Sequence, residues 1–415
     1  MGETAQRMEN VCDGIMELVS LGIYISVPFC RTKCSYCNFA SDVFSRAVFE
    51  RYVDRVCLDI GNARSTAQEM GGGIDADVDS IYLGGGTPTV LEPAQLRRIF
   101  GAVKAEFSVQ PDAELTVECA PGTLSPGVLE TLLECGVNRV SLGVQSFVNL
   151  EAAAVGRLHT RSTVMEDIAR LRAAGIANIN VDLIAGLPHQ TAASWHESLE
   201  QAIATGAPHV SVYMLEVDDE SRLGRELIAG GIRYHAHFVP DEDAVADFYS
   251  TACEFLNSAG IAQYEVSNFA RPGFQSRHNL KYWTRQPYLG FGVDAHSMLL
   301  TLGEGTEAVR FATADVLEKY VSGSPLLRTE ISRATALEEN FFLGLRLNRG
   351  VDLRGIAETF GQLVLESLQP TIADLIEGEM LQRKGDFICL TPRGRLLSNE
   401  VFQAFLAPSP ASTRA

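Results

Sequence analysis

Six short β-rich runs alternate with amphipathic helical stretches over the first half of the chain. The runs read as apolar on both faces, which is typical of strands in a parallel sheet covered by helices. They span residues 22–29, 79–87, 114–121, 139–146, 178–187 and 209–217. Six units are too few for a closed eight-stranded barrel, and no GxGxxG turn follows the first run, which disfavours a dinucleotide-binding sheet. The pattern predicts an α/β fold built on an open, partial (β/α)6 barrel of the TIM type.

Polar residues stand at the ends of the predicted strands. Cys30 follows the first strand, Gly84-Gly85-Gly86-Thr87-Pro88 ends the second, Glu118 closes the third, Gln145 closes the fourth and Asp182 lies near the end of the fifth. Each alone reads equally well as a turn, a structural ion pair or a satisfied core amide. Because the carboxyl ends of parallel strands meet at one mouth of such a barrel, the five together predict a site there.

Three cysteines, Cys30, Cys34 and Cys37, follow the first predicted strand at spacings of four and three residues. The same spacing would align three thiols on one face of a helix, and zinc is the rival metal. A structural zinc site needs four ligands, and no second Cys or His pair stands nearby. An iron–sulfur cluster held by three thiolates leaves one iron open to another ligand. The glycines after the second strand would let backbone groups approach a small zwitterion closely.

Composition limits the classes of partner. The 415 residues are 46% hydrophobic and carry a formal charge of −18, which would repel nucleic acid unless a basic patch is present locally. The nine cysteines are odd in number and scattered, a pattern of reduced thiols and not of a disulfide framework. No run approaches the ~20 apolar residues of a membrane span, and residues 1–20 lack a signal-peptide pattern. We expect a cytoplasmic protein.

The cysteine motif CxxxCxxC, with Tyr36 before its third cysteine, and the GGGTP segment resemble the radical S-adenosylmethionine (SAM) superfamily. The resemblance covers roughly residues 20–400 and is closest to the branch of oxygen-independent coproporphyrinogen III oxidase and the HemW-type heme chaperones. It implies a 4Fe-4S cluster bound by Cys30, Cys34 and Cys37, with SAM as a further ligand. The positions that match the SAM contacts of this branch are Tyr24, Gly85, Gly86, Thr87, Glu118, Gln145, Arg157 and Asp182.

Within this branch, two features favour the chaperones over the oxidase. The oxidase resembles CxxxCxxCxC, whereas Phe39 occupies the position of its fourth cysteine. The segment HNxxYW, residues 278–283, resembles the chaperone signature. The resemblance then implies heme as cargo, heme-acceptor proteins such as membrane respiratory enzymes as partners, peripheral association with the membrane through them, and a homodimer. The alternative is a coproporphyrinogen III oxidase that uses a SAM-derived radical.

The segment around HNxxYW is basic and aromatic. Between Glu265 and Asp294 it has no acidic residue, so it reads as the local basic patch of an acidic chain. Aromatic faces, guanidinium groups and an imidazole suit a flat macrocycle that carries two carboxylates and an iron. A barrel-closing segment with a structural histidine and a core tryptophan is the alternative. With the resemblance, the expected heme contacts are His278, Asn279, Tyr282 and Trp283.

The sequence divides into five parts. We expect an N-terminal segment at 1–20, the partial barrel at 21–217, a barrel-extending region with the HNxxYW motif at 218–320, a small helical, winged-helix-like domain at 321–406 and a disordered tail at 407–415. A hairpin with a turn at Gly385 supports the winged-helix prediction. Winged-helix domains often bind DNA, but the helices of this one are rich in Asp and Glu, so contact with protein or heme is favoured over nucleic acid.

Overall fold

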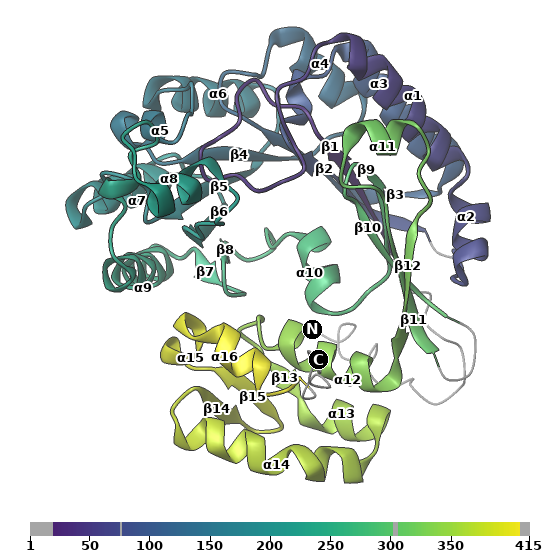
Figure 1. Ribbon diagram of the computed structural model, residues 1–415, viewed down its shortest axis with the longest axis vertical. Helices are drawn as coiled ribbons and strands as arrows, with labels where there is room; N and C mark the ends of the chain where they lie inside the picture. Colours follow the sequence, from purple (N-terminus) through teal and green to yellow (C-terminus); the bar gives the residue numbers. More distant parts are fainter. Residues whose placement is uncertain (1–19, 75–76, 302–305, 407–415) are drawn as a thin grey trace, which may run out of the picture.

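A computed structural model describes residues 20–74, 77–301 and 306–406. Its main feature is a curved twelve-stranded sheet that bends around a central space without closing (Figure 1). Six strands, β1 to β6, lie side by side in sequence order, and each is parallel to the next. They span Leu21–Val27, Val78–Gly85, Val109–Cys119, Arg139–Gln145, Asn178–Ala185 and His209–Met214. The six predicted strands are thus confirmed.

Both edges of this parallel sheet are extended. β9 (Tyr288–Gly292) pairs parallel with β1, and β10 (His296–Leu300), β11 (Thr306–Ala312) and β12 (Leu327–Ser332) continue antiparallel from it. At the other edge β8 (Asn268–Ala270) and β7 (Ala262–Gln263) follow β6. The two edges end in different strands that do not pair with each other, so the barrel is an open one, as predicted.

Helices cover the convex face of the sheet (Figure 1). They are α1 (Ala47–Gly61), α2 (Ala63–Met70), α3 (Pro93–Glu106), α4 (Pro126–Glu134), α5 (Asn149–Ala154), α6 (Arg161–Ala173), α7 (Ala192–Ala204), α9 (Glu242–Ser258) and α11 (Leu317–Val321). A further helix of this part, α8 (Arg222–Ala229), bonds to the loop after β1, where Leu223 N donates to Ser35 O at 2.8 Å. Alternate strand residues such as Ile23, Ile25 and Ile81 are fully buried in the core of the molecule. Since side chains alternate across a strand, the residues between them point into the central space.

The concave face of the sheet is polar, which corrects the prediction of strands apolar on both faces. Its buried side chains include Ser80, Glu114, Arg139, Asn180 and His209. They bond to one another across strands: Asn180 Oδ1 lies 2.6 Å from His209 Nδ1, and Asn180 Nδ2 donates to Ser141 Oγ at 2.7 Å. Buried polar groups are tolerated when they are hydrogen-bonded. This inner wall, the concave face of the sheet, therefore presents polar groups that can take part in ligand binding as well as in holding the fold together.

Helix α10 (Arg277–Trp283), which carries HNxxYW, lies inside the curve of the sheet (Figure 1). The Glu114 carboxylate accepts from Arg277 N at 3.1 Å and from His278 N at 3.3 Å. A carboxylate at a helix N-terminus satisfies free N–H groups and complements the helix dipole. At the other side Lys281 Nζ lies 2.8 Å from Asp79 Oδ1. The motif is therefore bound to β2 and β3 from both ends of the helix.

The C-terminal part has a second core and a three-stranded sheet of order β13-β15-β14. Its elements are α12 (Arg333–Gly344), β13 (Val351–Asp352), α13 (Leu353–Phe360), α14 (Gln362–Glu377), β14 (Leu381–Lys384), β15 (Phe387–Leu390), α15 (Pro392–Leu396) and α16 (Ser398–Gln403). β14 and β15 form the predicted hairpin, and Gly385 takes the left-handed backbone (φ 63°) that its turn requires.

The predictions for the N-terminal segment, apart from Ser20, and for the tail at 407–415 fall outside the described residues. In the part that is described, no helix has the length and apolar character needed to cross a membrane.

Candidate active site at the mouth of the barrel

The three cysteines lie in a loop that follows β1, and not on a helix, so the helical-stripe alternative is wrong. Cys30 N donates to Asp42 O at 3.0 Å and Asp42 N to Pro28 O at 3.0 Å, which closes the loop on itself. Two sulfurs accept hydrogen bonds from other elements: Thr87 Oγ1 lies 3.8 Å from Cys30 Sγ, and Arg157 Nη1 lies 3.5 Å from Cys34 Sγ. The loop thus places its thiols next to the glycine-rich end of β2 and next to a guanidinium group.

Burial raises the pKa values of the Cys30 and Cys37 thiols. A bound metal reverses this tendency because its positive charge favours the thiolate. Within residues 20–74, 77–301 and 306–406, no three Cys, His, Asp or Glu side chains converge on one point as ligands of a single ion. A 4Fe-4S cluster distributes its ligands over separate iron atoms, so it does not require that convergence.

Gly86 allows the loop to approach β2. A Cβ atom at Gly86 would lie 2.6 Å from Phe29 O and 2.9 Å from Val27 O, closer than real Cβ atoms come to their neighbours, and 3.0 Å from Cys30 Sγ. Gly85 has a φ of 99°, a conformation that residues with a side chain rarely adopt. The GGG sequence therefore brings the backbone at the end of β2 against the cysteine loop.

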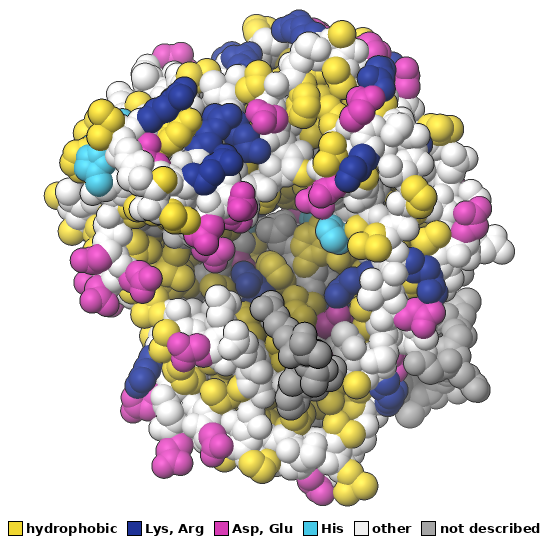
Figure 2. Space-filling view, viewed as in Figure 1, with side chains coloured by type: hydrophobic (Ala, Val, Ile, Leu, Met, Phe, Trp, Pro, Cys, Tyr) yellow, Lys and Arg dark blue, Asp and Glu magenta, His cyan; other side chains and the backbone are white. Residues whose placement is uncertain are grey.

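A cavity of about 240 Å³ opens beside this loop. Four of the predicted SAM-contact residues line it, together with residues from the cysteine loop and from the loop after β9. The lining consists of Tyr24, Ser26, Pro28, Phe39, Ala40, Ser41, Gly85, Gly86, Glu118 and Asp294. In the view shared by Figure 1 and Figure 2, the surface is hollowed between the part of the molecule that contains the sheet and the part that contains the C-terminal helices.

Glu118 is the charged group on β3 that lines the cavity. Its Oε1 accepts from Tyr82 OH at 2.9 Å, and its Oε2 accepts from Gly85 N at 3.1 Å. Burial, and then the nearby Asp182 carboxylate, raise the pKa of Glu118 to about 7, although the two hydrogen bonds oppose the shift. A carboxyl group with this pKa is ready to ionise when a cation arrives.

Two predicted residues that do not line the cavity, Gln145 and Arg157, have unused hydrogen-bonding atoms. Among the described residues, Gln145 Oε1 and Arg157 Nε are buried without a hydrogen-bond partner, while Arg157 Nη2 donates to Gly143 O. Gln145 also has a φ of 67°, an uncommon conformation for a residue with a side chain. Buried polar groups are rarely left unpaired in native proteins, so these atoms fit a polar ligand at the mouth.

Asp182 and Thr87 differ from this group. Asp182 accepts from Ser141 Oγ at 2.9 Å and from Asn180 Nδ2 at 2.7 Å, and burial raises its pKa. Like Gln145 and Arg157, neither residue lines the cavity, although Thr87 contacts Cys30. Asp182 acts on the cavity by raising the pKa of Glu118.

The HNxxYW histidine is enclosed by its neighbours. His278 is 1% exposed, its Nδ1 lies 3.1 Å from Ser80 Oγ, and its Nε2 lies 2.8 Å from Tyr282 OH. Burial lowers the pKa of His278 to about 3, so its imidazole is neutral. Trp283 lies under the guanidinium group of Arg346, whose carbon is 4.2 Å from the ring centre. Asn279 is half-buried, and its backbone N–H donates to Ser276 Oγ at 3.3 Å.

The basic patch expected around HNxxYW is largely neutralised by other elements. Lys281 pairs with Asp79 at 2.8 Å, Arg285 with Glu339 at 2.8 Å and Arg277 with Asp112 at 3.3 Å. Each of these three basic side chains thus has a carboxylate partner. Their carboxylate partners come from β2, α12 and β3, which are distant in the sequence.

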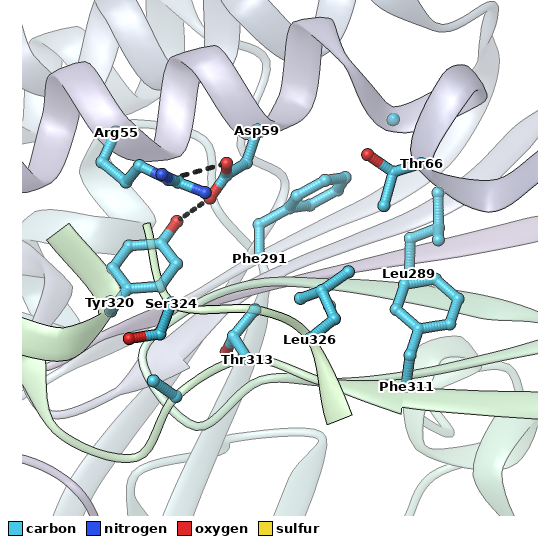
Figure 3. Close-up of a pocket in the computed structure, with 13 residues that line it drawn as sticks. Arg55, Asp59, Thr66, Leu289, Phe291, Phe311, Thr313, Tyr320, Ser324 and Leu326 are labelled. Atoms are coloured by element: carbon cyan, nitrogen blue, oxygen red, sulfur yellow. Dashed lines mark hydrogen bonds and ion pairs between the residues drawn. The ribbon is translucent and has the colours of Figure 1, made fainter. Parts of the chain in front are cut away.

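A smaller cavity, of about 80 Å³, lies on the other side of the sheet between α1, α2 and the strands β9 and β11 (Figure 3). There Tyr320 OH donates to Asp59 Oδ2 at 2.6 Å, and Asp59 pairs with Arg55 at 2.8 Å. None of the predicted site residues lines it. The candidate site is therefore the mouth cavity.

Sequence reasoning missed Tyr82 and gave Asp294 no role in the cavity. Tyr82 lies two residues before Gly84, so the alternation of the strand puts both on the concave face. Asp294 follows Gly292-Val293 and has a φ of 54°, and its Oδ1 lies 3.8 Å from His296 Nε2. The alternation of side chains along the strand is the one sequence signal that could have indicated Tyr82. No signal in the sequence indicates that Asp294 lines the same cavity as Tyr24.

Comparisons with known proteins show the family of the chain. Residues 24–202 match the family model described as the radical SAM superfamily, and residues 331–397 match that of the HemN C-terminal domain. The protein named heme chaperone HemW from Bacillus subtilis is 34% identical over 388 residues, which are 92% of this chain and 98% of that protein. The chain belongs to the HemW family of radical SAM proteins. The Escherichia coli member is 30% identical over 95% of this chain and 100% of its own length.

The fold has a solved counterpart outside the HemW family. The structure of coproporphyrinogen III oxidase (HemN) from Escherichia coli, a radical SAM enzyme, matches with a TM-score of 0.78 at 23% identity, over 93% of this chain and 90% of that one. This likeness confirms the predicted fold class, a partial radical SAM barrel with a small C-terminal domain.

Proposed function

We propose that this protein is a heme chaperone, which binds heme and transfers it to an acceptor protein while carrying a SAM-binding 4Fe-4S cluster. The observation that carries the proposal is the near full-length similarity to proteins named heme chaperone HemW. Phe39, at the position where the oxidase has a fourth cysteine, and the HNxxYW segment support it. Heme acceptors, including membrane respiratory enzymes, are then its partners, in the cytoplasm or at the membrane surface, and the chain acts as a homodimer.

The cysteine loop would hold the cluster through Cys30, Cys34 and Cys37. When bound, such a cluster offers an open iron to the amino and carboxylate groups of SAM and an electron for its cleavage. The chain's own residues bind and orient SAM. Gly85 and Gly86 have no Cβ atom, so their backbone groups can approach SAM closely. The Glu118 carboxylate pairs with the positively charged part of SAM. Gln145 and Arg157 offer polar atoms that have no partner within the protein.

The proposed heme contacts are His278, Asn279, Tyr282 and Trp283. The imidazole of His278 is neutral and is bonded at both nitrogens, so iron can reach Nε2 only when the Tyr282 hydroxyl moves away. Tyr282 and Trp283 supply aromatic faces. Arg346 lies over Trp283 and pairs with Glu265 at 3.7 Å, so it could pair with a propionate only by exchanging that carboxylate partner. Heme binding at this motif therefore includes a local rearrangement of α10.

The second candidate is a coproporphyrinogen III oxidase, which the fold of HemN and the matching C-terminal domain favour. Anaerobic incubation of the reconstituted protein with SAM, a reductant and coproporphyrinogen III separates the two. We expect no protoporphyrinogen IX and, in a parallel titration, saturable binding of one heme per chain. Protoporphyrinogen IX formed over many turnovers, without heme binding, would establish the oxidase instead.

SAM binding is expected to depend on pH through Glu118. The pKa of Glu118 is raised to about 7, so below that pH its carboxyl group is protonated and must release a proton before it can take the positive charge of SAM. The affinity should then fall by up to about tenfold for each pH unit below 7, and level off above it.

The test is SAM titration of the reconstituted protein from pH 5.5 to 8.5, with Glu118→Gln and, as control, Glu134→Gln. Glu134 is an exposed residue of α4 that pairs with Arg97. Glu118→Gln should bind SAM weakly at every pH, and Glu134→Gln should follow the wild type. A pH slope that persists in Glu118→Gln would assign the titration to another group.

A further inference from the structure

One strand contacts both the proposed SAM pocket and the proposed heme motif. On the concave face of β2, Ser80 Oγ lies 3.1 Å from His278 Nδ1, and two residues later Tyr82 OH donates to Glu118 Oε1 at 2.9 Å. At the end of the same strand, Gly85 N donates to Glu118 Oε2 at 3.1 Å. The pocket and the motif are thus joined by a few bonds along a single rigid element.

The Tyr82 ring connects the two sites by direct packing. Its centre lies 5.4 Å from that of the His278 imidazole, with 32° between the planes, and 6.1 Å from that of Tyr24, which lines the SAM pocket. Tyr24 and His278 are themselves 6.3 Å apart. A change in the strength of the hydrogen bond from the Tyr82 hydroxyl therefore alters the packing of the Tyr82 ring against the His278 imidazole.

We propose that Tyr82 is a positioning residue that couples the two sites, so that SAM in the pocket tightens the binding of heme at α10. The coupling rests on the proposed function. The sulfonium and ammonium groups of SAM favour the ionised form of Glu118, and a carboxylate accepts a stronger hydrogen bond from the Tyr82 hydroxyl. A fixed Tyr82 ring holds His278 in one orientation. The imidazole then loses less conformational entropy when it ligates iron, so heme binds more tightly.

Other charged groups also act on Glu118 and His278. Asp182 is held by Ser141 and Asn180, and both Asp182 and Arg139 act on Glu118 through space. Lys281 and Arg139 act in the same way on His278. Tyr82 is the residue that bonds to Glu118 and packs on His278. By linkage, heme must tighten SAM binding by the same factor.

The test compares Tyr82→Phe with Tyr320→Phe in the reconstituted protein. Both substitutions remove a hydroxyl that donates to a carboxylate, Glu118 in one case and Asp59 in the other, on opposite sides of the sheet. Heme is titrated with and without saturating SAM. We expect SAM to tighten heme binding about fivefold or more in the wild type and in Tyr320→Phe, and by a factor near one in Tyr82→Phe. A factor of one or less in the wild type, or an undiminished factor in Tyr82→Phe, overturns the coupling.

A second measurement needs no heme. The chain has two tryptophans, and Trp283 lies on α10. SAM should change its fluorescence in the wild type and not in Tyr82→Phe, with Trp283→Phe showing which signal comes from this residue. EPR of the reduced cluster verifies that SAM is bound in each variant. If heme fails to bind while the fluorescence response depends on Tyr82, the chaperone function fails, and Tyr82 still links the SAM pocket to α10. The same response in Tyr82→Phe overturns the role of Tyr82 whatever heme does.

Discussion

Replacing Cys34 by serine is expected to abolish the iron–sulfur cluster. Cys34 is the most buried of the three loop cysteines, and its sulfur lies 3.5 Å from Arg157 Nη1, so a lost thiolate there cannot be replaced by water. With two thiolates left, the iron content after anaerobic reconstitution should fall from about four atoms per chain to near zero. Iron and sulfide analysis, with the visible absorbance of the cluster, measures this directly. Cys30→Ser and Cys37→Ser should behave alike.

The control for this prediction is Cys253→Ser. Cys253 is a half-buried residue of α9, and its side chain hydrogen-bonds with Tyr249. We expect this variant to retain the full cluster. Wild-type iron content in Cys34→Ser, or an equal loss of iron in Cys253→Ser, would mean that other residues hold the cluster.

Replacing His278 by alanine is expected to weaken heme binding by at least tenfold and to leave the cluster intact. The same change leaves the hydroxyls of Ser80 and Tyr282 without their shared partner, so it should also lower the free energy of unfolding by about 2–4 kcal/mol. Heme titration, the iron content and a denaturant melt of the same preparation separate the loss of a ligand from the loss of the fold.

Tyr282→Phe distinguishes a ligand from a structural histidine. It removes the hydroxyl that occupies His278 Nε2 at 2.8 Å and keeps the ring, at a cost of about 1 kcal/mol in stability. If His278 ligates iron, this variant should bind heme as tightly as the wild type or more tightly. Should His278→Ala bind heme like the wild type, the motif would be a barrel-closing segment, and the heme would be held elsewhere.

The framework of the fold could be predicted because it depends on local periodicity. Each of the six parallel strands lies within a few residues of its predicted position, and glycine, cysteine and carboxylate residues at their ends mark the mouth. The strands β9 to β12 were not predicted. They are short, and the parallel pairing of β9 with β1 joins residues 288 and 22, a separation over which no single-sequence pattern carries information.

The inner wall was missed for a related reason. Residues such as Ser80, Asn180 and His209 read as interruptions in apolar runs, and their partners lie on neighbouring strands or on α10. The same holds for the basic residues of the HNxxYW segment, whose charges are balanced by Asp79 and Glu339 from distant elements. Long-range charge pairing decides whether a basic segment is a surface or part of the interior, and the sequence alone does not reveal it.

The central claim is that three sulfurs of the loop after β1 leave an iron atom open to SAM beside Tyr24, Gly85 and Glu118. EPR spectroscopy of the reduced, anaerobically reconstituted protein, recorded before and after addition of SAM, tests it most directly. We predict a 4Fe-4S signal whose g-values shift when SAM is added and stay unshifted when 5′-methylthioadenosine, which lacks the amino and carboxylate groups that would bind the iron, is added at the same concentration. A spectrum that SAM leaves unchanged would contradict the account.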